Sequence, residues 1–180
     1  WGYDGCVMAF ENSGRKPVVF PSQFQGEAGA SPGLLFIRAY NRWHGIIRRA
    51  LAKCGLTHPQ FVFLACTGYL AQNEEYMTQS MVANLADMDL MTISQLAVLL
   101  EKKGLILRTT HPQDSRAKSV SLSDEGQLRL SNSLPTVEVI DREFFGVLGS
   151  GQKDFAQMLR VLSAVTDGNI PGIEPDVISK

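Results

Sequence analysis

Apolar side chains recur at the spacing of one helical face within residues 92–103. The residues on this face are Ile93, Leu96, Ala97 and Leu100. The helix should end at Lys103, because positive charge is favourable at a helix C-terminus and Gly104 follows as a stop. Polar residues lie off the apolar face near the helix start, namely Thr92, Ser94 and Gln95. The pattern predicts an amphipathic helix with polar side chains at its N-terminal end.

Two short strands are predicted after this helix. Residues 105–110 are mostly β-branched or apolar, and residues 118–122 alternate between apolar and polar side chains, as a half-buried strand does. Between them, Pro112 and Asp114 favour a turn. Ser123 and the acids after it are typical of the start of another helix. The order helix, strand, loop, strand therefore predicts a small β-hairpin beside the amphipathic helix.

Helices are also predicted on both sides of this region. They cover residues 34–53, 57–71, the stretch from Thr78 to a turn at 87–89, 124–148 and 150–165. Two short helices joined by a few residues, the second amphipathic and polar at its start, are typical of a helix-turn-helix. The expected fold class is mostly α with a small β-hairpin wing (α+β), a winged helix-turn-helix with long N- and C-terminal dimerisation helices.

The same pattern divides the chain into five segments. We expect an N-terminal arm (1–33), a dimerisation helix (34–55), a winged helix-turn-helix module (56–126), C-terminal dimerisation helices (127–166) and a tail (167–180). The arm is rich in Gly, Pro and aromatic residues, so it either docks on another surface or is partly disordered. The long helices carry more apolar surface than one small module can cover, which favours a homodimer.

Charge and cysteine content narrow the class of protein. The formal net charge is -1, so total charge does not require a nucleic-acid partner. Residues 34–53 carry five bases and no acid, whereas residues 77–126 carry five bases and six acids. The three cysteines form no C-x-x-C pair, which favours reduced thiols and a cytoplasmic protein. No apolar run approaches the roughly 20 residues of a membrane helix, and no signal peptide is visible, so we expect no membrane association.

Four segments resemble the MarR family of bacterial transcription regulators. They are LTHPQF at 56–61, LLEKKGLI at 99–106 with Arg108 after it, HPQDSRAK at 111–118 and VSLSDEG at 120–126. The resemblance covers roughly residues 34–165, and the first 33 residues depart from the family pattern. It implies a homodimer that binds a pseudo-palindromic double-stranded DNA operator, usually as a repressor. In many relatives a small aromatic or phenolic ligand, bound near the junction of dimer and reading module, releases the DNA.

Eight residues are candidates for DNA contact on this reading. Hydroxyl, amide and thioether groups at the helix start could meet base edges in the major groove, and wing residues could reach the minor groove or phosphates. The candidates are Met91, Thr92, Ser94, Gln95, Arg108, Asp114, Arg116 and Lys118. Asp114 would fix the guanidinium of Arg116. The alternatives are a solvated helix start and an exposed ion pair of little energetic value.

A ligand site is predicted between the first two helices, lined by Tyr40, Trp43, His44 and Phe61. Aromatic residues on one helical face also pack in cores, and that alternative stays open. The three histidines lack the spacing of metal ligands, so no metal or cofactor is expected. No G-x-S-x-G, G-x-x-x-x-G-K or H-E-x-x-H motif is present, which argues against an enzyme.

Two other functions fit the sequence. A module that kept the fold but no longer binds DNA would explain the nearly balanced charge of residues 77–126. A thiol-based redox sensor would use Cys6, Cys54 or Cys66, although a thiolate at Cys54 would be opposed by the dipole of the helix that ends there.

The wing gives a direct prediction. Arg116→Ala should weaken operator binding and leave the dimer and its melting temperature nearly unchanged, because an exposed wing tip contributes little to folding. Anisotropy titration and thermal denaturation of the two proteins check this. A large fall in melting temperature would mean instead that Arg116 has a structural role.

Overall fold

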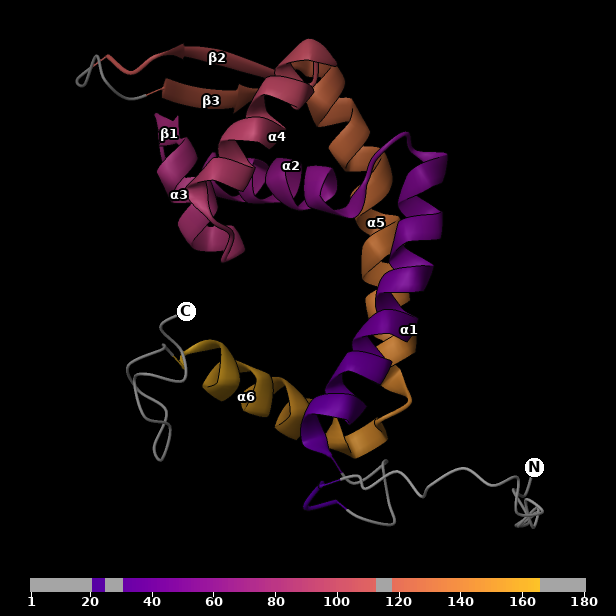
Figure 1. The fold of residues 1–180 in the computed structure, drawn as a ribbon. Helices are drawn as coiled ribbons and strands as arrows, with labels where there is room; N and C mark the ends of the chain where they lie inside the picture. The colour runs from indigo at the N-terminus through magenta and orange to yellow at the C-terminus, as the bar shows by residue number, and fades with distance from the viewer. Residues whose placement is uncertain (1–20, 25–30, 113–117, 166–180) are drawn as a thin grey trace, which may run out of the picture. The chain divides into compact units, whose positions relative to one another are not determined.

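The computed structural model describes residues 21–24, 31–112 and 118–165 (Figure 1). The helices are α1 (Pro32–Lys53), α2 (His58–Leu70), α3 (Gln79–Ala86), α4 (Leu90–Lys102), α5 (Asp124–Gly146) and α6 (Gln152–Ser163), with a short 3-10 turn η2 (Gly149–Gly151). The strands are β1 (Met77–Thr78), β2 (Ile106–Thr110) and β3 (Lys118–Leu122). The chain forms two compact units, Trp1–Asn41 and Arg42–Lys180, and the second holds all elements from α2 onward. The predicted fold class, mostly α with a small wing, is confirmed.

The strands form one antiparallel sheet in the order β1-β3-β2. In the hairpin, Arg108 lies opposite Val120 and Thr110 lies opposite Lys118. The two predicted strands are therefore confirmed, and β1 is an addition to them. Two residues are too few to show the alternation by which a strand is recognised in a sequence.

The core brings together α1, α2, α3, α4 and the sheet, with Val137 of α5. Its fully buried large apolar side chains are Phe63, Ile47, Leu51, Leu64, Ile93, Leu100, Ile106, Val82 and Val120. The predicted apolar face of α4 is buried along its whole length. Burial of this face fixes which side of α4 remains available at the surface.

The helix starts follow from side-chain caps. Thr57 and Gln60 form a reciprocal capping box at α2, and Ser123 caps α5 through the Gly126 N–H. The predicted start of the amphipathic helix at Thr92 is wrong by two residues. The Asp89 carboxylate accepts the Thr92 N–H at 2.7 Å, so Asp89 is the cap and α4 begins at Leu90.

The start of α5 sits directly on the turn that ends α4. Ser123 donates its hydroxyl to the Gly104 carbonyl at 2.6 Å and its N–H to the Leu105 carbonyl at 3.1 Å. Gly126 is buried, and a Cβ at this position would lie 1.8 Å from the Leu105 carbonyl oxygen. Only a residue without a side chain permits this approach of the two backbones.

The described helices include none that is by itself long and apolar enough to cross a membrane. Taken together, the bent pair α3 and α4 has the length and apolar composition of a membrane-crossing segment. Val82, Ala83, Ile93 and Ala97 of this pair are buried in the core described above.

Gly126→Ala should destabilise the fold by about 3 kcal/mol or more, because the methyl group meets backbone that cannot rotate away. Urea denaturation followed by circular dichroism measures the change. Gly146→Ala is the matched control at the end of the same helix, where nothing lies within 4 Å of a Cβ, and it should be neutral or slightly stabilising. Equal stability of the two variants would contradict this close contact.

Candidate functional site

The pair α3 and α4 has the geometry of a helix-turn-helix. The two helices bend by 117° across the short turn, within the range of about 90–120° typical of this motif. Asp87 makes the turn possible, since it takes the left-handed conformation with φ of 50° and ends α3. Figure 1 shows the hairpin β2–β3 beside α4, and α4 contacts both α3 and β2.

The N-terminal end of α4 lies at the surface. Met91 is 72% exposed and Gln95 is also exposed, whereas Thr92 and Ser94 are half-buried. The Thr92 hydroxyl donates to the Asp89 carboxylate at 2.5 Å, so its proton is already used. This hydrogen bond, with that from the Thr92 N–H, holds the pKa of Asp89 below its ordinary value. All four predicted base-contact residues thus lie on the first two turns of α4, and Gln95 is the exposed amide among them.

The wing residues take different roles in the structure. Lys118 is exposed at the start of β3. Arg108 is only 20% exposed and pairs with Glu101 of α4 at 3.2 Å, so its guanidinium joins the wing to the helix. Asp114 and Arg116 lie outside the described residues, and their predicted contacts stay predictions.

One lysine and one arginine side chain hold the turn between α1 and α2 in place. Lys103, at the end of α4, donates to the Gly55 carbonyl at 3.3 Å and to the Gln60 side chain at 3.1 Å. Arg129 of α5 donates to the Cys54 carbonyl at 2.7 Å. One backbone turn is therefore shared by the end of α4 and the beginning of α5.

Of the four predicted ligand residues, two belong to a packed cluster. The Trp43 indole donates to the Asp141 carboxylate of α5 at 2.7 Å and meets His58 edge-on at 5.3 Å between ring centroids. His44 also packs on His58, at 5.1 Å. Burial, and then the neighbouring His44, lower the pKa of His58, and Asp141 opposes them. The periodicity of the sequence had not indicated His58.

Phe61, the third, is 6% exposed and belongs to the apolar core. Tyr40, the fourth, is 41% exposed and lies in the N-terminal unit. The sequence-based ligand site therefore consists largely of residues that already have packing partners.

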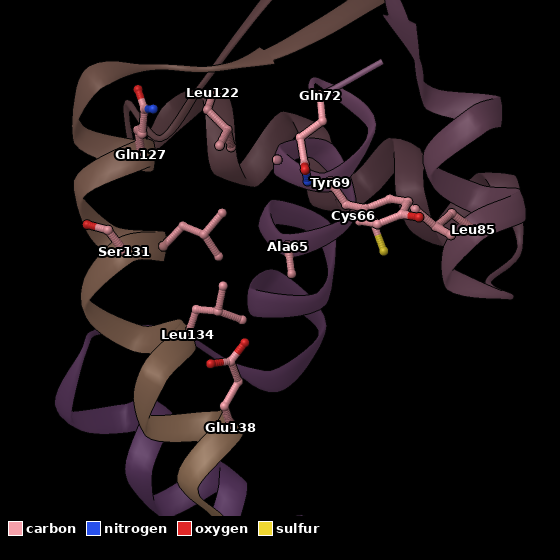
Figure 2. A pocket seen from close by; sticks show the side chains of 12 residues that line it. Ala65, Cys66, Tyr69, Gln72, Leu85, Leu122, Gln127, Ser131, Leu134 and Glu138 are labelled. Atoms are coloured by element: carbon pink, nitrogen blue, oxygen red, sulfur yellow. The ribbon is translucent and has the colours of Figure 1, made fainter. Parts of the chain in front are cut away.

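A cavity of about 670 Å³ lies elsewhere, between α2, α5, α3 and β3 (Figure 2). It is lined by Ala65, Cys66, Gly68, Tyr69, Gln72, Leu85, Leu122, Gln127, Leu130, Ser131, Leu134 and Glu138. Its volume is that of a small-molecule site. None of the four predicted ligand residues lines it. The only signal in the sequence was the spacing of the α5 residues on one helical face, which core packing would explain equally well.

The thiols show little sign of a redox sensor. Cys66 lines the cavity, and burial raises the pKa of its thiol, which lowers the fraction present as reactive thiolate. Cys54 is half-buried, and Cys6 lies outside the described residues. Among the residues that the structure describes, no three His, Cys, Asp or Glu side chains gather closely enough to hold a metal ion.

Comparison with known proteins gives one family. The MarR family model matches residues 56–118. The chain is 39% identical over 124 residues to the uncharacterized HTH-type transcriptional regulator YdcH of Bacillus subtilis (strain 168). The matched region covers 69% of this chain and 84% of YdcH.

Solved structures share the fold. The regulator BpsR of Bordetella bronchiseptica, whose DNA binding is regulated by 6-hydroxynicotinic acid, has a TM-score of 0.69 and 23% identity over 78% of this chain and 98% of that one. The repressor CouR bound to a 23-mer DNA duplex has a TM-score of 0.68 and 24% identity over 77% of this chain and 96% of that one. CouR, from Rhodococcus jostii RHA1, has also been solved with p-coumaroyl-CoA.

The packed cluster gives a prediction for pH. Because the pKa of His58 is lowered from 6.5 on folding, the unfolded chain binds the proton more readily. Stability should therefore fall as pH drops below about 6.5 toward the folded-state pKa, and His58→Gln should make this decline shallower.

Urea midpoints measured between about pH 7.5 and pH 5 test the effect. If the stability of the native protein and that of His58→Gln declined equally steeply with falling pH, the attribution of this decline to His58 would be refuted.

Proposed function

Because this chain belongs to the MarR family of winged helix-turn-helix DNA-binding transcription regulators, we propose that it acts in the cytoplasm as a homodimeric repressor of a pseudo-palindromic operator. The proposal is carried by the exposed start of α4, which projects polar side chains while its opposite face is buried in the core. The family is one of regulators and not of enzymes. Membership of the MarR family also argues against the alternative function, a protein-interaction module that kept the fold but no longer binds DNA.

The proposed base contacts come from the first two turns of α4. Gln95 is exposed and carries both a donor and an acceptor, as adenine recognition in the major groove requires. Met91 could meet a thymine methyl group, and Ser94 could donate a hydrogen bond. Thr92 is better suited to accept a hydrogen bond, because its proton goes to Asp89.

The wing supplies the remaining contacts. Lys118 and Arg116 would neutralise phosphates or enter the minor groove, with Asp114 orienting Arg116. Arg108 suits a second purpose better than phosphate contact, because its pair with Glu101 fixes the wing relative to α4. We retain it in the site as a residue that positions the hairpin.

The homodimer is supported by apolar surface that one copy leaves uncovered. Helix α6 has no buried residue, and Met158, Val161 and Leu162 are each about 60% exposed. In the N-terminal unit, Leu35, Phe36 and Ile37 of α1 are about half exposed. We propose that residues 34–55 and 127–166 form the dimer and residues 56–126 read the DNA. Sedimentation should give twice the 19.8 kDa chain mass, and a monomer at micromolar concentration would refute the dimer.

We propose that the cavity between α2 and α5 holds a small ligand that releases the DNA. Its walls join Leu122 of the wing to the long scaffold helix α5, so a molecule bound there contacts both parts. Structural neighbours bind aromatic acids or their derivatives. The site predicted at Tyr40, Trp43, His44 and Phe61 remains a second location, disfavoured because Trp43 and Phe61 are already packed.

The repressor proposal predicts tight, salt-dependent binding to DNA upstream of the protein's own gene and of its neighbours, measured by fluorescence anisotropy against random duplex DNA. Gln95→Ala should weaken operator binding by about 10- to 100-fold, the value of one good base contact, without affecting random DNA. Val98→Ala, also exposed on α4 but one turn further from its start, should bind as the native protein does. Equal affinity of the native protein for operator fragments and random DNA would refute specific repression.

A further inference from the structure

The wall of the cavity contains one charged side chain. Glu138 is this residue, and no Lys, Arg or His occurs among the lining residues that the structure describes. Figure 2 shows the Glu138 carboxylate at one end of the cavity, directed toward Leu134 and Ala65. Glu138 has no ion pair among the described residues, and the next basic residue on α5, Arg142, pairs with Glu143 at 3.3 Å.

The other polar groups on the wall are uncharged. Tyr69 comes from α2 and Gln72 from the turn after it, and Gln127 and Ser131 come from α5. The Ser131 hydroxyl donates to the Leu128 carbonyl at 2.9 Å, so its proton is not available to a ligand. The floor between these groups is apolar, formed by leucines of α3, β3 and α5 with Ala65 and Gly68.

This distribution of charge discriminates between ligands of similar shape. A carboxylate placed here would lose hydration without gaining a cation, and it would be repelled by Glu138. An ammonium group would instead pair with Glu138 at the exposed end of the cavity, where such a pair contributes modestly. The apolar body of either ligand would contact the same leucines, so charge decides between them.

We propose that this cavity takes an apolar organic cation, a ring-bearing molecule with a protonated amine directed at Glu138, and that it discriminates against aromatic carboxylates. The inference rests on the proposed effector role of the cavity and adds the chemical class of the ligand. BpsR, by contrast, is regulated by an acid.

Three probes that share an indole ring and a short side chain test the charge preference. They are tryptamine (cationic), tryptophol (neutral) and indole-3-propionate (anionic), each titrated into the full chain by calorimetry. Tryptamine should bind at least about tenfold more tightly than indole-3-propionate, a difference of about 1.4 kcal/mol, with tryptophol between them.

Two variants separate charge from shape. Glu138→Gln keeps the size of the side chain and should bring the affinities for tryptamine and indole-3-propionate to within about twofold of each other. Glu143→Gln removes a carboxylate from the same helix outside the cavity and should keep the preference for tryptamine.

The location of binding is read from the cysteines. Saturating tryptamine should slow alkylation of Cys66, which lines the cavity, and leave Cys54, which does not, unaffected in the same sample. Peptide mass spectrometry measures both rates.

Each result bears on a different statement. If indole-3-propionate binds most tightly and protects Cys66, the inference about charge is overturned and the effector cavity stands. If none of the three probes binds or protects Cys66, both the inference and the effector cavity are overturned. If tryptamine binds through Glu138 but leaves operator affinity unchanged, the ligand class is supported and only its role in releasing DNA is refuted.

Discussion

The burial of one face of α4 is the constraint on which the rest of the structure depends. Ile93, Ala97 and Leu100 are fully buried against the core. Truncating a large buried side chain such as Ile93 or Leu100 to alanine typically costs about 2–5 kcal/mol. A helix held in this way cannot rotate about its axis without exposing these residues. The polar side chains of its first two turns are therefore presented in one fixed direction, and the caps, the wing and α5 are arranged around that direction.

Polar contacts at both ends and on one side of α4 restrain the helix further. Asp89 fixes the start of α4, Lys103 ties its end to the turn before α2, and Glu101 joins it to Arg108 of the wing. The Arg108–Glu101 ion pair contributes little energy alone, and the Asp89 cap contributes modestly. Together the three contacts restrain both ends and one side of a helix whose opposite face is already buried, so the polar surface at its start is held in one arrangement.

Much of the fold follows from local patterns, and little of the cavity does. The apolar spacing of α4 and the alternation in β3 are properties of neighbouring residues, so periodicity predicted them. The start of α4 was misplaced because Asp89 suits a turn and a helix cap equally well. The cavity combines Cys66 of α2 with Leu122 and Glu138, and only tertiary packing brings these together. Aromatic residues suggested a ligand site at Trp43, but its indole had a partner in Asp141 that lies 98 positions away.

The contact between Gly126 and the Leu105 carbonyl has a consequence for the evolution of this chain. Most clashes inside a protein can be relieved by a smaller side chain on the facing residue. Here the facing atom is a backbone oxygen, which every amino acid carries, so no substitution at position 105 can make room for a side chain at position 126. Revertants of a Gly126 variant should regain glycine itself. At this contact between the end of α4 and the start of α5, a substitution cannot be compensated by a change in the facing residue.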